Sequence, residues 1–478
     1  MPTIGMGVDI AELVDATIAE NSKDMIAIAR DLLHRGAPAA ELAGRAGLIA
    51  AAGDSDGHAI LTLDAAAALS RWMPALPLLP DQDPQSHEQE LPLLVQALVA
   101  TASALREGNK AQVSYPDPLF PSELEEGKTV DEAMHEAVYS NDATRVERLL
   151  FGLYGTGADY RTMEVRTYDG ISTTFQLGGH PLMCAVRGFQ LLDAVEWGDR
   201  APHILHWLTP HLPLHSEEPE WIQAVRAFHA DPAHSLASLR TRLSAPKDVN
   251  ALPLRGLIQS DADTTQICQA VYDALIKGGA SSRGVGSVIA LAATDLMQRV
   301  GNGDRDEFLR AAHGLLFAAA ASVIYSRVQD IAALPLLFTA AASANALYKD
   351  LSQDVQTAES AETASTSTFL GGGLIAPALL ETLSEQVEGQ DYIGAVASAR
   401  RYLQLDNDPR ALFATIGLLA ARADAATDAG HTLQIVQAAG EVYLAWPTSL
   451  NNINIDTLLL VALRAATFAR RNAVVDNL

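Results

Sequence analysis

The feature of this chain that most constrains its fold is a short pattern that occurs four times. Each copy has a small residue, then a histidine, then an apolar and alanine-rich run. The four copies begin with Gly57-His58, Gly179-His180, Ala312-His313 and Gly430-His431. The histidines are separated by 122, 133 and 118 residues. Similarity that returns at such intervals indicates a chain assembled from related structural units.

The runs that follow the histidines predict helices, because alanine and leucine lose the least free energy on entering a helix. These helices are expected at 59–72, 181–197, 314–328 and 432–443. A helix that ends in a turn rich in Gly, Asp or Asn precedes each of them, at 26–33, 146–154, 267–276 and 393–405. A second helix follows that turn, at 39–51, 159–166, 285–300 and 410–425. Later helices are expected at 201–212 and 458–471.

The spacing of the copies also predicts how the chain is organised. Copies one and three are 255 residues apart, and copies two and four are 251 residues apart. We therefore predict an all-α, helical-repeat architecture of four related units, arranged as two duplicated halves at 1–245 and 246–478. The Ser/Thr/Ala/Glu stretch 355–369 is expected to be a flexible surface loop. A pair of short strands is an alternative for 163–176, where Thr and Tyr alternate with other residues.

Composition narrows the class of protein. The net charge of −25 argues against nucleic acid or an anionic membrane surface as a partner. The first twenty residues carry Asp9, Glu12 and Asp15 and no basic segment, so no signal peptide is expected. The most apolar stretches are about half as long as a bilayer requires. The two cysteines, Cys184 and Cys268, provide no disulfide framework and suit the reducing cytoplasm, where we expect the protein.

Four equivalent histidines can converge on one centre, and four imidazoles at one centre predict a metal ion. A histidine at the start of a helix lies near the positive end of the macrodipole, which disfavours the imidazolium form. The neutral ring is the form that binds metals, and imidazole-rich sites suit iron, zinc, copper or nickel. The predicted metal ligands are His58, His180, His313 and His431.

Two other interpretations of the pattern remain open. Each small residue and histidine can be an inherited capping device, with the ring bonded to a backbone carbonyl. The chain would then be a metal-free helical-repeat module that binds a partner or a small apolar ligand. The other interpretation is haem held by pairs of these histidines.

The remaining candidate residues are expected to be structural or solvated. His203, His206, His211 and His215 are predicted to line a wet surface or an interface. Cys184 lies one helical turn after His180 and is expected to be a buried thiol. Trp72, Trp197 and Trp207 are expected in the core. The sequence identifies no general base.

The four Gly/Ala-His helix starts, in an all-α chain of this length, resemble the questin-oxidase-like family. They are also similar to the helical segment attached to some bacterial Rieske-type proteins. The resemblance implies a non-haem iron, Fe(II), oxygenase whose ligands are His58, His180, His313 and His431. It implies oxidative ring cleavage or Baeyer–Villiger-type oxidation of a small apolar aromatic, polyketide-like substrate with dioxygen. Another transition metal, and an external electron donor, are compatible with it.

The chain departs from the family pattern in one respect. Iron in this family can also take an oxygen ligand from a carboxylated lysine, and no lysine lies within a turn of any of the four histidines. Lys349 is the lysine found in a repeat helix, and it aligns with Arg106. The fifth ligand is therefore expected to be water or a carboxylate. No Rieske pair of Cys-x-His motifs occurs, so electrons would come from elsewhere.

Overall fold

All regular secondary structure in the described part of the chain is helical. The computed structural model describes residues 6–19, 21–77, 87–107, 114–241, 245–301, 304–328, 330–354 and 376–472. Within these ranges there are α-helices and short 3-10 helices but no strand, and Ala423 and Arg471 form one isolated β-bridge. The predicted all-α class is confirmed. The predicted surface loop at 355–369 lies outside the described residues.

The helices of the N-terminal part have the following bounds: α1 Met6–Ile18, α2 Ser22–His34, α3 Ala39–Ala50, α4 His58–Ser70, α5 Leu91–Glu107, α6 Val130–Tyr139, α7 Ala143–Gly155, α8 Tyr160–Gly170, α9 His180–Ala194, α10 Ala201–Leu208 and α11 Trp221–Ala230. Those of the C-terminal part are α12 Pro253–Ile258, α13 Thr264–Ile276, α14 Ser282–Arg299, α15 Arg305–Arg327, α16 Pro335–Asp354, α17 Ala376–Glu388, α18 Tyr392–Gln404, α19 Pro409–Ala420, α20 Ala425–Asp428, α21 His431–Leu444 and α22 Asp456–Thr467.

The helices expected from the sequence are present, and most of their ends agree to within a few residues. The strand pair considered for 163–176 is wrong, because α8 occupies most of that segment. The side chain of Asp159 accepts a hydrogen bond from the Thr162 amide and so caps the start of α8. A capped helix start satisfies the local backbone donors, which leaves none of them for a sheet.

The start expected for the third of the histidine helices is also wrong. α15 begins at Arg305, and His313 is its ninth residue. The reason is a cap upstream of the histidine, where the Asp304 carboxylate accepts a hydrogen bond from the Glu307 amide at 2.9 Å. The acidic residues Asp306 and Glu307 in the first turn further stabilise this earlier start.

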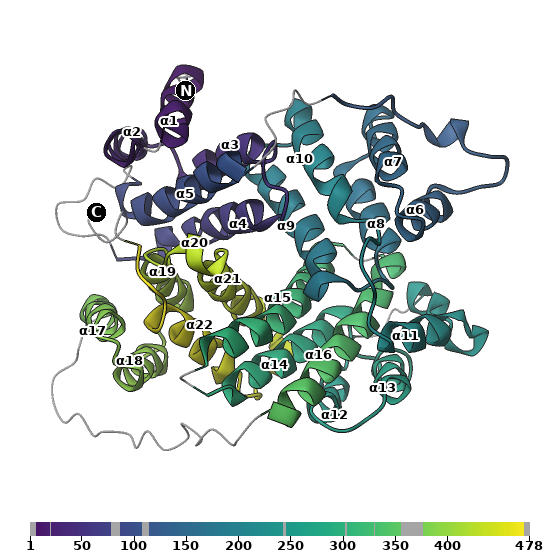
Figure 1. The fold of residues 1–478 in the computed structure, drawn as a ribbon. Coiled ribbons are helices and arrows are strands. Elements are labelled where there is room, and N and C mark those ends of the chain that lie inside the picture. Colours follow the sequence, from purple (N-terminus) through teal and green to yellow (C-terminus); the bar gives the residue numbers. More distant parts are fainter. Residues whose placement is uncertain are drawn as a thin grey trace.

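The centre of the molecule is a bundle of the four histidine-bearing helices, α4, α9, α15 and α21 (Figure 1). α4 packs against α9, α9 against α15, α15 against α21, and α21 against α4, so the four form a closed ring. From Ala59 to Ser70 every residue of α4 is buried. A helix that is buried on all sides belongs in the interior of a large protein, and α4 occupies that place.

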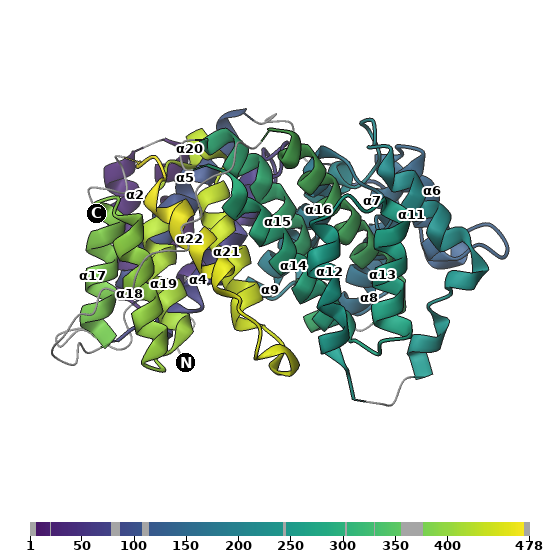
Figure 2. The same cartoon turned by 90° about the horizontal axis from the view of Figure 1, so that it is seen from below.

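Each of these four helices is covered on its outer side by two others. α3 and α5 pack on α4, α8 and α10 on α9, α14 and α16 on α15, and α19 and α22 on α21. Seen at right angles, the molecule is elongated, with α17 near one end and α6 near the other (Figure 2). Nearly all buried apolar side chains of the described residues form one continuous cluster. The four histidine helices and the helices that cover them therefore share a single hydrophobic core.

Two segments, Arg305–Arg327 and Ile331–Leu351, are long and apolar enough to cross a membrane by length and composition. The expectation that the apolar stretches are about half as long as a bilayer requires is therefore wrong for these segments, since residues 331–348 alone contain no charged residue. Most residues of both segments are buried inside the protein. Such burial is what a core helix of a large helical protein requires.

Candidate metal centre

Three of the four histidines are the first residue of a helix, and a glycine in the left-handed conformation places each of them there. φ is +86° at Gly57, +92° at Gly179 and +71° at Gly430. A β-carbon at Gly179 would lie 2.3 Å from Phe317 Cδ2, and one at Gly430 would lie 1.9 Å from Thr62 Oγ1. Glycine is needed at these two positions both for the backbone angle and for the close approach of neighbouring core helices.

The four predicted ligands lie together at one end of the central bundle. Nε2 of His180 lies 3.2 Å from Nε2 of His58, and Nε2 of His431 lies 3.2 Å from Nε2 of His313. The ring centroids are 5.0 Å apart for His58–His180, 5.3 Å for His180–His313, 4.8 Å for His313–His431 and 5.3 Å for His431–His58. The rings thus form a closed four-membered arrangement that follows the order of the helices. His313 joins it from within α15 although it does not start that helix.

Hydrogen bonds at the other ring nitrogens fix how three of the imidazoles are protonated. Nδ1 of His313 donates to the Leu309 carbonyl at 3.1 Å, and Nδ1 of His431 donates to the Asp428 carbonyl at 2.5 Å. Nδ1 of His180 donates to the Leu177 carbonyl. A neutral ring has one N–H, so Nε2 carries a bare lone pair in each of these three residues. These carbonyl bonds are also the ones that the capping interpretation of the sequence expects.

The three rings are held in the neutral form. Burial lowers the pKa of His180 to about 4 and that of His431 to about 3, and it lowers the pKa of His313 as well. Repulsion between positive charges on neighbouring histidines lowers the pKa of all three rings further. At neutral pH the Nε2 atoms of His313 and His431 therefore face each other with a lone pair on each. Two facing lone pairs cannot form a hydrogen bond, and a cation between them would remove the repulsion.

Carboxylates lie next to the histidines, but they mainly accept hydrogen bonds from backbone amides at the helix starts. Asp56 Oδ2 is 3.2 Å from His58 Nδ1, although without the alignment of a good hydrogen bond, and this partner lowers the pKa of Asp56. Asp54 accepts from the amides of Ala59 and Ile60 at 3.1 and 3.0 Å, and burial raises its pKa to about 6. These contacts fix the start of α4 and hence the position of His58.

Asp428 has the corresponding role at the start of α21. Its carboxylate accepts hydrogen bonds from the Gly430 amide at 3.0 Å and from the Thr432 hydroxyl at 2.5 Å. Arg305 of α15 donates to the same carboxylate at 3.1 Å. The residue that anchors His431 is thereby linked to the helix that carries His313.

The separation of the rings fits a shared ion. Two nitrogen ligands about 2.1 Å from one transition-metal ion lie about 3.2 Å apart when they subtend an angle of about 100°. Metal-bound histidines also donate the second ring N–H to a carbonyl or carboxylate, as His180, His313 and His431 do here. The rings face each other as two pairs. Within the described residues no group of three or more His, Cys, Asp or Glu side chains already has the arrangement of a metal site. Binding of one ion to all four would therefore require the rings to turn toward a common point.

A fifth histidine, His211, lies beside this cluster, contrary to the expectation of a wet surface. Its Nε2 is buried and has no hydrogen-bond partner among the described residues. Burial is the main cause that lowers its pKa to about 4, and His180 contributes next. A β-carbon on Gly57 would lie 3.6 Å from its Cε1 and 2.8 Å from Cys184 Sγ. His211 lies outside the repeated pattern, because the turn after α10 places it beside the site. No sequence spacing therefore indicates that it belongs there.

Several neighbouring predictions have a clear outcome. Cys184 is fully buried, and both cysteines are free thiols. Trp197 and Trp207 are core residues, as expected, whereas Trp72 is only partly buried and packs against the core. Nζ of Lys349 donates to the Ala262 carbonyl at 2.6 Å, so this lysine is engaged elsewhere. His206 pairs with Glu147 at 2.5 Å, and His203 lies 3.4 Å from the Tyr115 hydroxyl.

A second polar layer lies deeper in the bundle and was not predicted. Asp64 follows His58 by six residues, which corresponds to about 9 Å along α4. Its side chain is fully buried, and that burial raises its pKa to about 6. Arg187 donates to both carboxylate oxygens of Glu441, at 2.7 and 3.0 Å, and lies 3.7 Å from Asp64. Gln437 donates to Asp64 at 2.7 Å and to Glu441 at 3.1 Å, which joins the two acids.

Comparison with protein families, with curated proteins and with solved structures gave no match for this chain.

Proposed function

We propose that this protein is a metal-dependent oxidoreductase whose His58, His180, His313 and His431 bind one transition-metal ion. The observation that carries the proposal is the pair of Nε2 lone pairs, on His313 and His431, that face each other at 3.2 Å. Buried polar atoms are normally paired, and a metal ion is the partner that several neutral imidazoles share.

The ligand type supports particular metals, because imidazole nitrogens suit iron, zinc, copper or nickel. The four rings contact one another around a cycle and would have to turn to share one ion. The choice among these metals therefore rests on the family resemblance. Fe(II) is the ion that the resemblance to the questin-oxidase-like family implies. Bound iron would supply the redox chemistry for the reaction of dioxygen with an aromatic, polyketide-like substrate.

The residues of this chain would serve that chemistry in defined ways. The carbonyls of Leu177, Leu309 and Asp428 hold three rings in one tautomer. The His58 side chain is 22% exposed, so the cluster is accessible to small molecules. Leu177, 55% exposed, offers an apolar contact beside His180. An external electron donor would have to approach from this side.

The domain organisation belongs to the same proposal. Four units, each made of one histidine helix and two flanking helices, would form two halves at 1–245 and 246–478. The ring of four histidines would then take two ligands from each half. The pairs of flanking helices around α4, α9, α15 and α21 support this view.

Metal analysis tests the proposal directly. The purified chain, reconstituted anaerobically with Fe(II) and freed of excess metal, should retain about one iron per chain by elemental analysis. His431→Ala should lose it, and the exposed His203→Ala should keep it. An iron content near zero in the reconstituted wild type would contradict the proposal and favour the metal-free module. A Soret band in the purified protein would instead indicate haem.

The oxidoreductase activity needs a second measurement. Iron-loaded protein should consume dioxygen when an aromatic polyketide and a reductant are present, and His431→Ala should not. If the chain binds iron but consumes dioxygen only at the background rate, the proposed metal site is supported and the proposed oxidoreductase activity is contradicted.

A further inference from the structure

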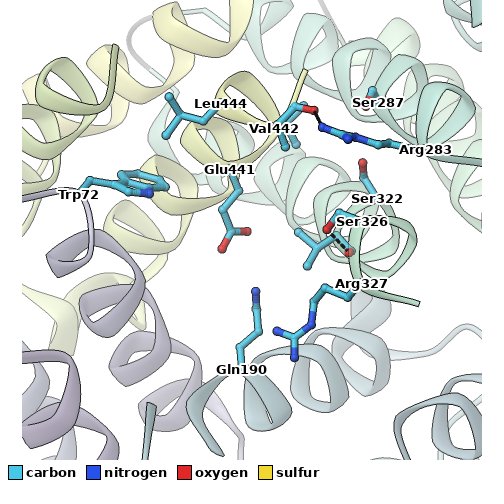
Figure 3. Close-up of a pocket in the computed structure, with 12 residues that line it drawn as sticks. Trp72, Gln190, Arg283, Ser287, Ser322, Ser326, Arg327, Glu441, Val442 and Leu444 are labelled. Carbon is cyan, nitrogen blue, oxygen red and sulfur yellow. Dashed lines mark hydrogen bonds between the residues drawn. The ribbon is translucent and has the colours of Figure 1, made fainter. Parts of the chain in front are cut away.

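The central bundle contains a pocket at the end opposite to the histidines. Its volume is about 300 Å³, and residues after α4 and on α9, α14, α15 and α21 line it (Figure 3). Gln190 and Glu441 each follow the histidine of their own helix by ten residues, which corresponds to about 15 Å. A molecule in this pocket could not touch the histidine cluster. The pocket is therefore a separate site, and the inference drawn from it does not rest on the proposed function.

The pocket wall presents hydrogen-bond donors that the protein leaves unused. The hydroxyls of Ser287 and Ser322 make no hydrogen bond with any described residue, although Ser287 is only 2% exposed. Nε of Arg327 is buried and also has no partner within the described residues. The amide oxygen of Gln190 accepts from Arg187 at 2.7 Å, and its nitrogen end points into the pocket toward Glu441 (Figure 3). Apart from Nε of Arg327, these donors face the open space of the pocket, where the acceptors of a ligand could reach them.

The acceptors and charges of the pocket are largely engaged. Glu441 is the acidic residue of the lining, and its carboxylate already accepts hydrogen bonds from Arg187 and Gln437. Arg327 is paired with Glu164 and Asp193. Arg283, at the exposed rim, donates to the Ala445 carbonyl and has no acidic partner in the described part of the chain. One positive charge is thus available at the pocket in a chain whose net charge is −25.

Part of the pocket lining is apolar. It runs from Val442, next to Arg283, past Leu444 to the Trp72 ring on the far side (Figure 3). The Trp72 ring is held tightly, because a β-carbon on Gly440 would lie 2.6 Å from its Cη2. A rigid indole face suits a flat apolar group, since aromatic rings stack with a large contact area.

We propose that this pocket binds a small monocarboxylate with a flat apolar body. The carboxylate would accept from Arg283 and from the hydroxyls of Ser287 and Ser322, which lie together on one side of the pocket (Figure 3), while the body would extend toward Trp72. Charge-assisted hydrogen bonds of this kind are the stronger ones in proteins. A phosphate dianion fits less well, because the carboxylate of Glu441 lines the same space.

Benzoate is the probe that tests this site, with benzamide as its neutral analogue and inorganic phosphate as the other anion. Calorimetric titration of the full chain should show benzoate binding, with benzamide and phosphate at least tenfold weaker. Arg283→Gln should weaken benzoate binding about tenfold or more. The double variant Ser287→Ala with Ser322→Ala should also weaken it, and its fold should be unaffected, since neither hydroxyl makes an internal hydrogen bond. Arg410→Gln, an exposed arginine outside the pocket, is the matched control and should bind as wild type does.

The other outcomes overturn the proposal. No benzoate binding at 10 mM would exclude the site. Equal affinity for benzamide would exclude recognition of the charge, and tighter binding of phosphate would exclude a carboxylate as the favoured ligand. If Arg283→Gln and Arg410→Gln lose the same amount of benzoate affinity, the loss comes from the net charge of the protein and not from a contact in the pocket. These measurements need no bound metal, so they are independent of the iron analysis.

Discussion

Nε2 of His313 lies 3.2 Å from Nε2 of His431, while Nδ1 of each ring points to a backbone carbonyl of its own helix start or helix turn. Both Nε2 atoms are acceptors in the neutral rings, so neither can donate to the other. This relationship distinguishes the cluster from a set of histidines that simply cap helices. A cap accounts for the carbonyl bond alone and leaves the two Nε2 lone pairs facing each other, a repulsion that the proposed metal ion would remove.

Metal binding is expected to resist acid more than ordinary histidine sites do. Protons compete with a metal only below the pKa of the free ligands, and burial brings the pKa of His180 to about 4 and that of His431 to about 3. The affinity for Zn²⁺, used as a probe, should therefore fall less between pH 7.5 and pH 5 than that of a site made of four solvated imidazoles. Competition titrations with a chelator measure it, and circular dichroism verifies the fold at each pH. An affinity that falls as steeply as that of four solvated imidazoles would contradict the prediction.

Gly430→Ala is expected to destabilise the protein and to displace His431. A left-handed alanine costs about 1 kcal/mol or more, and the added β-carbon would lie 1.9 Å from Thr62 Oγ1. We expect a total loss of about 3 kcal/mol in the free energy of unfolding. Gly157→Ala is the matched control, because its φ is also +71° but nothing lies within 4 Å of the added carbon. Equal losses in the two variants, measured by urea unfolding, would mean that the contact with α4 is unimportant.

Arg187→Met should be among the most damaging substitutions in the bundle. It leaves the carboxylates of Glu441 and Asp64 buried without their cation. Breaking a buried pair from one side costs about 3–5 kcal/mol, whereas an exposed pair contributes about 1 kcal/mol or less. Arg410→Met, which removes the exposed partner of Asp408, provides the comparison. Similar unfolding free energies for the two variants would contradict the importance of the buried layer.

Asp64→Asn should change how stability depends on pH. Burial raises the pKa of Asp64 from 3.8 to about 6, so the folded state binds more protons than the unfolded state between these values. Wild-type stability should therefore fall as pH rises from 4 to 7, relative to the variant, by roughly 3 kcal/mol. Urea unfolding of both proteins at several pH values measures this difference. Parallel stability curves would show that Asp64 ionises in the fold as readily as in the unfolded chain.

The sequence was sufficient to predict the all-α class and most helices, because caps and alanine-rich runs are local signals. It also predicted which four histidines meet, since they occupy the same place in a repeated pattern. The start of α15 was missed because the cap at Asp304 lies nine residues before His313 and outside that pattern. His211 was missed because tertiary packing alone places it beside Gly57 and the histidine cluster. No local spacing encodes such a contact.

The buried layer of Asp64, Arg187 and Glu441 had a signal that was overlooked. Each of these charged residues interrupts an otherwise apolar run within a histidine helix. A charge at such a position must be paired in a buried bundle, so it predicts a partner on a facing helix. Which partner it finds depends on the rotation of the helices about their axes, and that follows from three-dimensional packing.

The ring of histidines joins positions 58, 180, 313 and 431, which lie far apart along the polypeptide. An ion shared by them would act as a cross-link that closes three loops of more than a hundred residues each. Closing such long loops removes much of the freedom of the unfolded chain, and the ion would bind only the folded form. Loading would therefore protect the whole molecule from proteases and heat, and stripping the ion would expose regions remote from the centre.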